Sequence, residues 1–324
     1  MALRRLPRAR PGQRRGDRHL DITEPGRNFS DAGLDSQKAV RAAGWKARTV
    51  SERHPYLDGP YPRAYAHRGW HIGELTGCEN TLAAFHRAVD EGFGYLELDV
   101  RVTADGVPVV HHDPTLDRTT TGAGEIRALR AADLTTVLGA GSEPIPLLEQ
   151  VLTEFPDTRI TIELKSDAVV GPVLAVLERT AAWHRVCLGA RHEARLRRAR
   201  REAGPRLFTS IAMRSAVALR GRAWMDGLPG PLAMVPTPPV HGWLAQLPRR
   251  FGSLTVVDAG LVRTAHRTGR EVHVWTVDDP GEMAELLDLG VDGLLSDRPD
   301  LLRDVLADRD QWAARGDPPT DLRR

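Results

Sequence analysis

Two acidic residues, two positions apart, are the first feature of this sequence that could support chemistry. Residues 95–100 read YLELDV, and side chains alternate along a strand, so Glu97 and Asp99 share one face while the other face is apolar. Neighbouring carboxylates repel each other, and a hard divalent cation with oxygen ligands is a common way to hold them together. Taken alone, such a pair would more often mark a solvated strand face.

Two flanking strand ends favour the metal site over that alternative. A short strand at 64–67 ends in His67 and Arg68, and a β-branched run at 107–110 leads into His112. Imidazole titrates near neutral pH, so histidines at these strand ends could take part in proton transfer. The combination of acids and histidines therefore predicts a divalent-metal site.

Four motifs carry a resemblance to a known family. The segments HRG, ENT, ELD and HHDPTLDRTT, in this order within residues 63–121, closely resemble the glycerophosphodiester phosphodiesterase family. The resemblance is also clear at 160–166 and 272–299, and it is weak between 200 and 255. It implies a TIM-type barrel, a divalent metal and two catalytic histidines. The implied reaction is hydrolysis of a glycerophosphodiester to an alcohol and glycerol 3-phosphate.

The resemblance also assigns roles to the residues that match the family's pattern. It implies catalysis by His67 and His112, metal binding by Glu97, Asp99 and Glu163, and substrate binding by Arg68, Lys165 and Trp275. The implied cofactor is one divalent cation, and Mg²⁺ and Ca²⁺ both suit carboxylate ligands. Because the family's histidine directly precedes Asp-Pro, the pattern selects His112. Strand alternation then points His111 the other way, as a packing or rim residue.

Several of these residues also have simpler interpretations. Glu163 could pair with Lys165 or a neighbouring arginine, Lys165 could be a surface lysine at a strand end, and a bare Trp275 would more often be core. Asn80 is a plausible helix N-cap, which would explain it without a role at the site. The remaining histidines in the domain are interpreted as ordinary, because no motif contains them: His71, His241, His266 and His273.

The elements that must position these residues repeat as strand–helix units. Eight strands are predicted, at 64–67, 95–100, 159–165, 185–190, 207–211, 232–235, 271–277 and 291–295. Helical periodicity is predicted between them, at 81–91, 126–138, 146–155, 169–180, 192–202, 214–222, 260–268, 280–289 and 300–307. Such repeats predict an α/β fold, a (β/α)₈ TIM-type barrel with a short insertion after the second strand. Active sites of such barrels lie at the C-terminal ends of the strands, where the candidate residues fall.

Composition restricts the partners and the location. The chain has 324 residues and a net charge of +2, but residues 1–20 hold seven arginines and one aspartate, so the rest is net acidic. A nucleic-acid partner is therefore not expected. The sequence shows no apolar run long enough to span a membrane and no secretory signal, and its two cysteines suit a reducing compartment, so a cytoplasmic location is predicted. The oligomeric state is not predicted.

The predicted organisation is a disordered basic extension at 1–55, the barrel domain at 56–310 and a frayed tail at 311–324. Two other functions remain open. One is phospholipase D-type cleavage of lysophospholipids or sphingolipids on the same fold, with Trp243, Leu244 and Leu247 in the segment 236–253 as apolar candidates beside the mouth. The other is a non-catalytic binding protein on a barrel scaffold.

Overall fold

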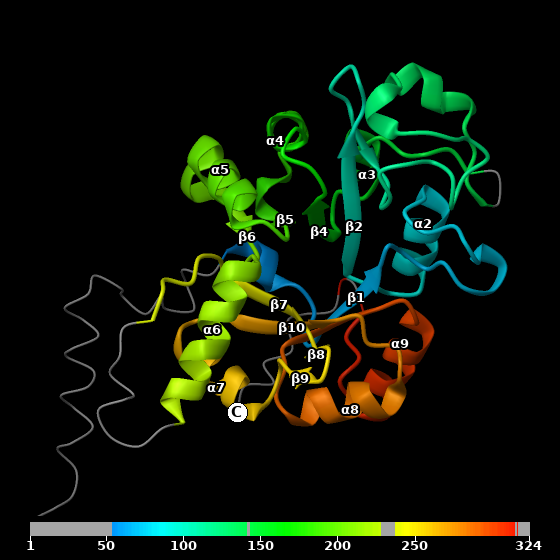
Figure 1. Ribbon diagram of the computed structural model, residues 1–324. Helices are drawn as coiled ribbons and strands as arrows, with labels where there is room; N and C mark the ends of the chain where they lie inside the picture. Colours follow the sequence, from blue (N-terminus) through cyan, green and yellow to red (C-terminus); the bar gives the residue numbers. More distant parts are fainter. Residues whose placement is uncertain (1–53, 141–142, 228–236, 315, 317–324) are drawn as a thin grey trace, which may run out of the picture. The chain divides into compact units, whose positions relative to one another are not determined.

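A computed structural model describes residues 54–140, 143–227, 237–314 and 316. These residues belong to one compact unit. Its central feature is a sheet of eight parallel strands (Figure 1). In sheet order they are β6 (Phe208–Thr209), β5 (Val186–Gly189), β4 (Arg159–Leu164), β2 (Tyr95–Val102), β1 (Arg63–His67), β11 (Gly293–Ser296), β10 (Glu271–Trp275) and β7 (Leu244–Pro248).

The two edge strands meet and close the sheet into a barrel. Ser210, directly after β6, forms a parallel bridge with Leu244 of β7. Backbone hydrogen bonds on either side of it run from the Trp243 amide to the Thr209 carbonyl (2.9 Å) and from the Ile211 amide to the Leu244 carbonyl (2.8 Å). The predicted TIM-type barrel is therefore confirmed. Because all eight strands are parallel, their C-terminal ends surround one mouth.

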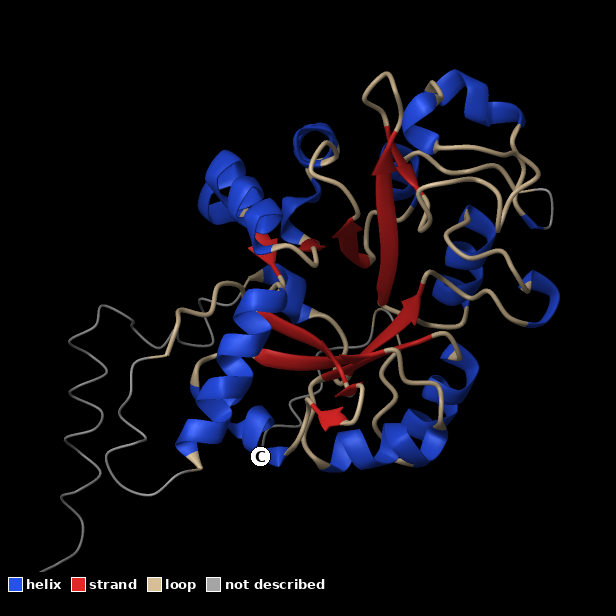
Figure 2. Ribbon diagram, viewed as in Figure 1, coloured by secondary structure: helices blue, strands red, loops and turns tan. Residues whose placement is uncertain are grey.

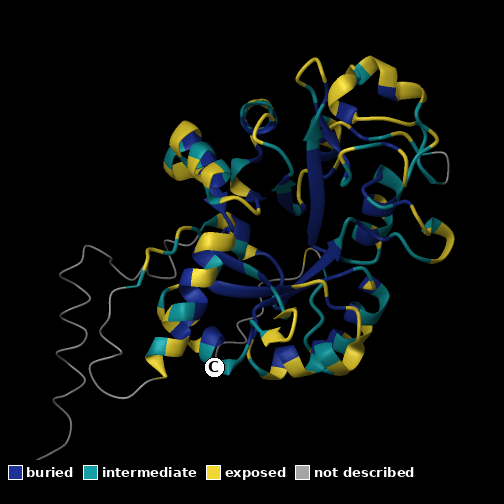
Figure 3. Cartoon of the chain, in the orientation of Figure 1, coloured by how far each residue is buried: buried dark blue, intermediate teal, exposed yellow. Residues whose placement is uncertain are grey.

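Helices follow most strands and cover the outside of the barrel (Figure 2). They are α2 (Leu82–Asp90), α3 (Leu148–Glu154), α4 (Val170–Arg179), α5 (Glu193–Ala203), α6 (Met213–Asp226), α7 (Ala259–Arg267), α8 (Pro280–Asp288) and α9 (Pro299–Asp308). The outward residues of the strands, such as Leu96 and Leu98 of β2, are fully buried in the main apolar core with the inner helix faces (Figure 3). This core accounts for the apolar face of YLELDV. No helix among the described residues is long and apolar enough to cross a membrane.

The inside of the barrel is partly polar. A short 3₁₀ turn, η2 (Pro55–Asp58), brings Tyr56 into contact with Tyr65 of β1 (3.0 Å between hydroxyl oxygens) and with the Thr161 hydroxyl of β4 (2.7 Å). All three side chains are buried. The N-terminal side of the barrel is thus filled by side chains that satisfy one another's hydrogen bonds, as buried polar groups require.

The predicted insertion lies after β2. β3 (Pro108–Val110) pairs antiparallel with the end of β2, and the chain then passes through the 3₁₀ turns η4 (Ile126–Ala128) and η5 (Ala131–Thr136). A small separate apolar cluster around Leu116 and Ile126 supports this region. The single helix predicted at 126–138 is therefore wrong: the segment forms two short 3₁₀ turns.

The sixth barrel strand of the described residues lies later in the chain than the strand predicted at 232–235. The segment 232–235 lies outside the described residues, and the sixth barrel strand is β7 at Leu244–Pro248. The chain after β7 forms a small hairpin of β8 (Arg250–Phe251) and β9 (Leu254–Thr255). The predicted basic extension falls, up to residue 53, outside the described residues, as do residues 317–324 of the predicted tail. The predicted domain boundaries stay predictions.

Candidate active site at the barrel mouth

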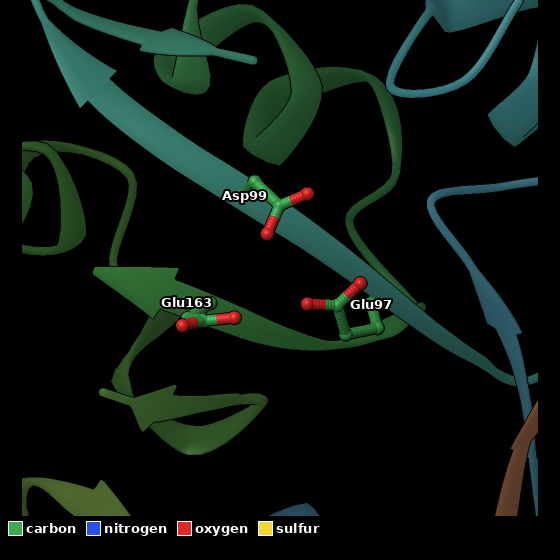
Figure 4. Close-up of side chains that lie close together, drawn as sticks. All are labelled: Glu97, Asp99 and Glu163. Carbon is green, nitrogen blue, oxygen red and sulfur yellow. The ribbon is translucent and has the colours of Figure 1, made fainter. Parts of the chain in front are cut away.

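Three carboxylates from two adjacent strands lie together at the mouth. Glu97 and Asp99 come from β2 and Glu163 from β4, where Asp99 and Glu163 are directly paired in register. One carboxylate oxygen of each lies within 4.8 Å of the others (Figure 4). Glu97 and Asp99 are buried and Glu163 is half-buried. The alternation expected from the sequence thus gathers the three predicted metal ligands at one place.

Asp99 is surrounded by hydrogen-bond donors. Lys165 Nζ lies 2.8 Å from Oδ1, and Oδ2 is 3.1 Å from Arg68 Nε and 3.0 Å from the Asn80 side-chain amide nitrogen. Burial alone would raise the pKa of this carboxyl, but the positive charges of Lys165 and Arg68 outweigh it and lower the pKa. Asp99 is therefore ionised and fixed in position at neutral pH.

The surroundings of Glu97 raise its pKa, whereas those of Asp99 lower it. Its Oε2 accepts no hydrogen bond from the described residues, and its nearest charged neighbour is His67 Nε2 at 3.5 Å. Burial, reinforced by the negative charge of Asp99, raises the pKa of Glu97 to about 8. A buried carboxylate with a vacant lone pair, aimed at two other acids, is the arrangement that a bound cation would stabilise.

His67 is held between two acids at the end of β1. Its Nδ1 lies 2.6 Å from Asp297 Oδ1, and its Nε2 faces Glu97. Burial favours the neutral imidazole, but Glu97 and Asp297 outweigh that effect and raise the pKa of His67. The carboxylate of Asp297 fixes the ring orientation and leaves Nε2 directed toward the acid cluster.

His112 is held in a similar way from the insertion side of the mouth. Its Nδ1 lies 2.6 Å from Asp113 Oδ1, and Arg118 Nε donates to the other oxygen of Asp113 at 2.6 Å. The hydrogen bond from Arg118 is the largest effect that lowers the pKa of Asp113. The positive charge of a protonated His112 is also among the effects that lower the pKa of Asp99.

Arg68 and Asn80 reach the site from strained backbone positions. Their φ angles are +57° and +62°, in the left-handed region that non-glycine residues rarely adopt. The Arg68 amide donates to the Glu97 carbonyl at 2.9 Å, and the Asn80 amide donates to the Arg68 carbonyl at 2.9 Å. Such strain commonly occurs at functional sites, where the surroundings hold the backbone in place. Asn80 is not the N-cap of α2; that residue is Thr81.

Lys165 and Trp275 complete the predicted set. Lys165 Nζ bridges Asp99 and Glu163, at 2.8 Å from each, so it is not an ordinary surface lysine. Trp275 ends β10 with 43% of its surface exposed, so it is not a core residue. Six of the eight residues predicted for the site lie at or beyond the C-terminal part of a barrel strand; Glu97 lies in the first half of β2, and His112 follows β3 of the insertion.

Comparison with known proteins decides the family. The profile described as the Glycerophosphoryl diester phosphodiesterase family matches residues 63–301, which is most of the barrel. The chain belongs to the glycerophosphoryl diester phosphodiesterase family. The resemblance drawn from the sequence motifs and the enzyme class that it implies are thereby confirmed.

Relatives within this family are similar over most of the chain. A Mycobacterium tuberculosis protein named "Probable glycerophosphodiester phosphodiesterase 2" is 40% identical over 258 residues, which cover 77% of this chain and 92% of that protein. The human protein named "Lysophospholipase D GDPD1" is 28% identical over 269 residues, covering 74% and 85%. An Oleispira antarctica phosphodiesterase, solved in complex with the product sn-glycerol-3-phosphate, aligns with a TM-score of 0.61 and 22% identity, covering 76% and 97%; it supports the fold alone.

Several residues at the site of this phosphodiesterase-family chain were missed by sequence reasoning. Asp297 follows the last barrel strand and contacts both His67 and His71, the latter with 3.2 Å from Nε2 to Oδ1. His71 was interpreted as ordinary, and it lies at the mouth beside Asp297. Arg118 links Asp113 to Glu79 through hydrogen bonds. The position of Asp297 directly after a strand was a usable signal, because strand ends line the mouth.

His111 lies where strand alternation placed it. It is buried, and its Nε2 lies 3.1 Å from the Thr115 carbonyl oxygen within the insertion. Burial lowers its pKa, which favours the neutral ring. His273 is buried inside the barrel, where Tyr65 and Glu271 contact its two ring nitrogens.

Proposed function

We propose that this chain hydrolyses glycerophosphodiesters to glycerol 3-phosphate and an alcohol, with the help of one divalent cation. The observation that carries the proposal is the gathering of Glu97, Asp99 and Glu163 beside two histidines, each oriented by its own aspartate. The family and the names of its members support the substrate class.

The carboxylate cluster fits a divalent cation. Oxygens on opposite sides of Ca²⁺ are about 4.6–5.2 Å apart, and on Mg²⁺ about 4.2 Å. The three carboxylate oxygens here already lie within 4.8 Å of one another, and Glu97 Oε2 has a free lone pair. Glu97, Asp99 and Glu163 would therefore hold either ion with small movements. When bound, the cation would polarise a phosphoryl oxygen and offset negative charge in the transition state.

Two cationic side chains bind the phosphate. Arg68 presents a planar guanidinium suited to two phosphate oxygens, and Lys165 adds a compact positive charge. Both contact Asp99, so both are held beside the carboxylate cluster. Trp275, exposed at the end of β10, contacts the alcohol part of the substrate.

The histidines move the protons. Water attacks phosphorus, the bond to the alcohol oxygen breaks, one imidazole accepts the proton of the water and the other donates a proton to the alcohol. Asp297 holds His67 and Asp113 holds His112 in the orientation that this transfer needs. General acid–base catalysis of this kind contributes about 10²- to 10⁴-fold.

The test is release of alcohol from glycerophosphocholine by the full chain, with Mg²⁺, with Ca²⁺ and with a chelator. His112→Ala lowers kcat by about 10²-fold or more. His184→Ala is the matched control, because His184 is exposed on the turn before β5, away from the mouth. Activity that survives both the chelator and His112→Ala would end the proposal. Calorimetry that detects no Mg²⁺ or Ca²⁺ binding would instead favour a non-catalytic barrel.

A second substrate class, the lysophospholipids, is supported by the name of the human relative. The apolar residues suggested for lipid binding are not free to contact a lipid: Leu244 and Leu247 are buried in β7, and Trp243 is partly buried against the cluster that contains Tyr56. The exposed Phe251 beyond β7 is a better candidate. Side-by-side rates on glycerophosphocholine and lysophosphatidylcholine separate the two substrates. The cytoplasmic location inferred from the sequence stays a prediction, which cell fractionation would test.

A further inference from the structure

Exposed apolar side chains lie on the segments that follow two neighbouring barrel strands, at the start of α6 and in the hairpin of β8 and β9. Seven large apolar side chains are exposed in the described part of the chain. Met213, in the connection after β6, is 43% exposed, and Phe251 and Leu254, in the hairpin after β7, are 67% and 44% exposed. Figure 3 colours most of this hairpin as exposed. A soluble surface rarely groups such residues without a binding role.

The hairpin of β8 and β9 exposes two apolar residues beside its turn. Phe251 and Leu254 are paired across β8 and β9, with only two residues between them. The turn includes Gly252, whose φ of +58° suits a tight two-residue hairpin. Because paired residues project on the same side, the two side chains form one apolar tip.

This tip lies beside the catalytic mouth. Pro248, at the end of β7, is paired in register with Trp275, at the end of β10. Phe251 follows Pro248 by three residues, a span of at most about 10 Å. β6 and β7 are neighbours through the bridge from Ser210 to Leu244, so Met213 belongs to the same side of the mouth.

Three exposed arginines lie next to Met213 or Phe251 in the chain or through a backbone hydrogen bond. Arg191 follows β5, and its carbonyl accepts the Met213 amide at 3.2 Å. Arg214 follows Met213, and Arg250 precedes Phe251. None of the three has a carboxylate within 4.0 Å among the described residues, whereas their neighbours Arg195 and Arg249 are paired with acids. We call Met213, Phe251, Leu254, Arg191, Arg214 and Arg250 the basic apolar rim.

We propose that the basic apolar rim docks this protein on an anionic lipid surface, with the hairpin tip entering the interface between headgroups and acyl chains. Guanidinium groups bind lipid phosphates, and an apolar tip between them gains by burial in the bilayer boundary. A second copy of the chain suits the rim poorly, because a symmetric contact would bring its arginines against one another. The proposal does not depend on the catalytic assignment.

The test is co-sedimentation of the full chain, in chelator, with phosphatidylcholine vesicles that contain or lack phosphatidylglycerol. Wild type binds the phosphatidylglycerol vesicles more tightly, and 0.5 M salt weakens this preference. Phe251→Ser with Leu254→Ser lowers the affinity about tenfold or more. Arg250→Gln lowers it about fivefold on the anionic vesicles only.

Two matched controls test whether the effect belongs to the rim. Trp224→Ser removes an exposed aromatic ring on α6, about 16 Å along the helix from Met213, and Arg201→Gln removes an exposed arginine near the end of α5. Both control variants are expected to bind the vesicles with the affinity of wild type. Thermal unfolding checks that every variant is folded. The proposal is overturned if wild type does not sediment with anionic vesicles. It is also overturned if the variant with Phe251→Ser and Leu254→Ser binds as well as wild type, because that result would assign binding to the arginine-rich residues 1–20. Equal weakening by a control variant would also overturn it.

Discussion

Asp297 Oδ1 lies 2.6 Å from His67 Nδ1, and the two residues are joined across the barrel seam between β11 and β1. The first and last strands of the barrel thus combine to orient one catalytic candidate. The ring nitrogen that remains, Nε2, is the one directed at the carboxylate cluster. In the proposed mechanism the carboxylate of Asp297 acts through His67 and is a positioning residue.

Replacing Asp297 by asparagine is expected to lower kcat by about 10²- to 10⁴-fold with little change in KM. The amide can no longer stabilise the charged imidazole or fix its tautomer, while phosphate binding through Arg68 and Lys165 is left intact. Steady-state kinetics on glycerophosphocholine measure both constants. His71→Gln, which removes the other histidine on Asp297, is the control and lowers kcat far less. A change confined to KM would contradict the positioning role.

Glu97 links metal binding to stability. A saturating cation at about 100 times its Kd stabilises the native state by about 2.7 kcal/mol, so Ca²⁺ or Mg²⁺ raises the Tm of the wild type. Glu97→Gln is expected to abolish this rise, because it removes a buried ligand oxygen. The metal-free variant is at least as stable as the metal-free wild type, because a buried carboxyl with an unbonded oxygen is lost.

Differential scanning calorimetry with and without each ion measures this effect. Glu125→Gln is the control, because Glu125 is an exposed acid of the insertion, paired with Arg127 on the surface. This variant keeps the full metal-dependent rise in Tm. A Glu97→Gln protein that responds to the ions like wild type would remove Glu97 from the proposed metal site.

Arg63 and Glu271 form a buried ion pair at the N-terminal side of the barrel. Their side chains are joined by two hydrogen bonds of 3.1 and 3.2 Å, and Arg63 also donates to the Leu57, Gly59 and Pro60 carbonyls. Burial alone would raise the pKa of Glu271, but His273 and Arg63 outweigh it and hold the pKa well below its usual range. The pair fixes the segment before β1 across the barrel end.

Glu271→Gln is expected to destabilise the protein by about 3–5 kcal/mol at pH 7, because it leaves a buried arginine without its counterion. A carboxyl with a lowered native pKa contributes stability that is complete above its unfolded pKa, about 4.3. This contribution is lost as pH falls toward the native pKa. The difference in unfolding free energy between wild type and Glu271→Gln therefore narrows below about pH 4. Urea unfolding of both proteins across pH 3–7 measures this difference in unfolding free energy. Glu149→Gln breaks an exposed pair with Arg179 and costs at most about 1 kcal/mol.

Much of the site could be predicted from the sequence, because alternation in a strand is a strong geometric rule. Once residues 95–100 were taken as a strand, Glu97 and Asp99 had to share a face, and the parallel repeat placed Glu163 beside them. His111 and His112 separated for the same reason. These inferences needed only local periodicity and the common direction of the strands.

The missed features depend on contacts between distant segments. Nothing near residue 297 indicates that its carboxylate meets His67, 230 positions away, until the barrel closes. Leu244–Pro248 was missed as a strand because prolines surround it and because its partners are far away in sequence. The 3₁₀ turns of the insertion were also missed, since short turns have little periodicity of their own.

Gly242 allows the chain to enter the strand that closes the barrel. Its φ is +113°, and a Cβ atom built there would lie 2.4 Å from the Ser210 carbonyl oxygen. Gly242→Ala is therefore expected to destabilise the protein by about 2–4 kcal/mol, from backbone strain combined with overpacking against β6. Gly269→Ala separates the two causes, because Gly269 has a φ of +73° with nothing within 4 Å of the added Cβ. The Gly269→Ala variant is expected to lose only about 1 kcal/mol of unfolding free energy, measured by thermal or urea unfolding. Equal losses in the two variants would show that the contact with Ser210 contributes nothing to closure.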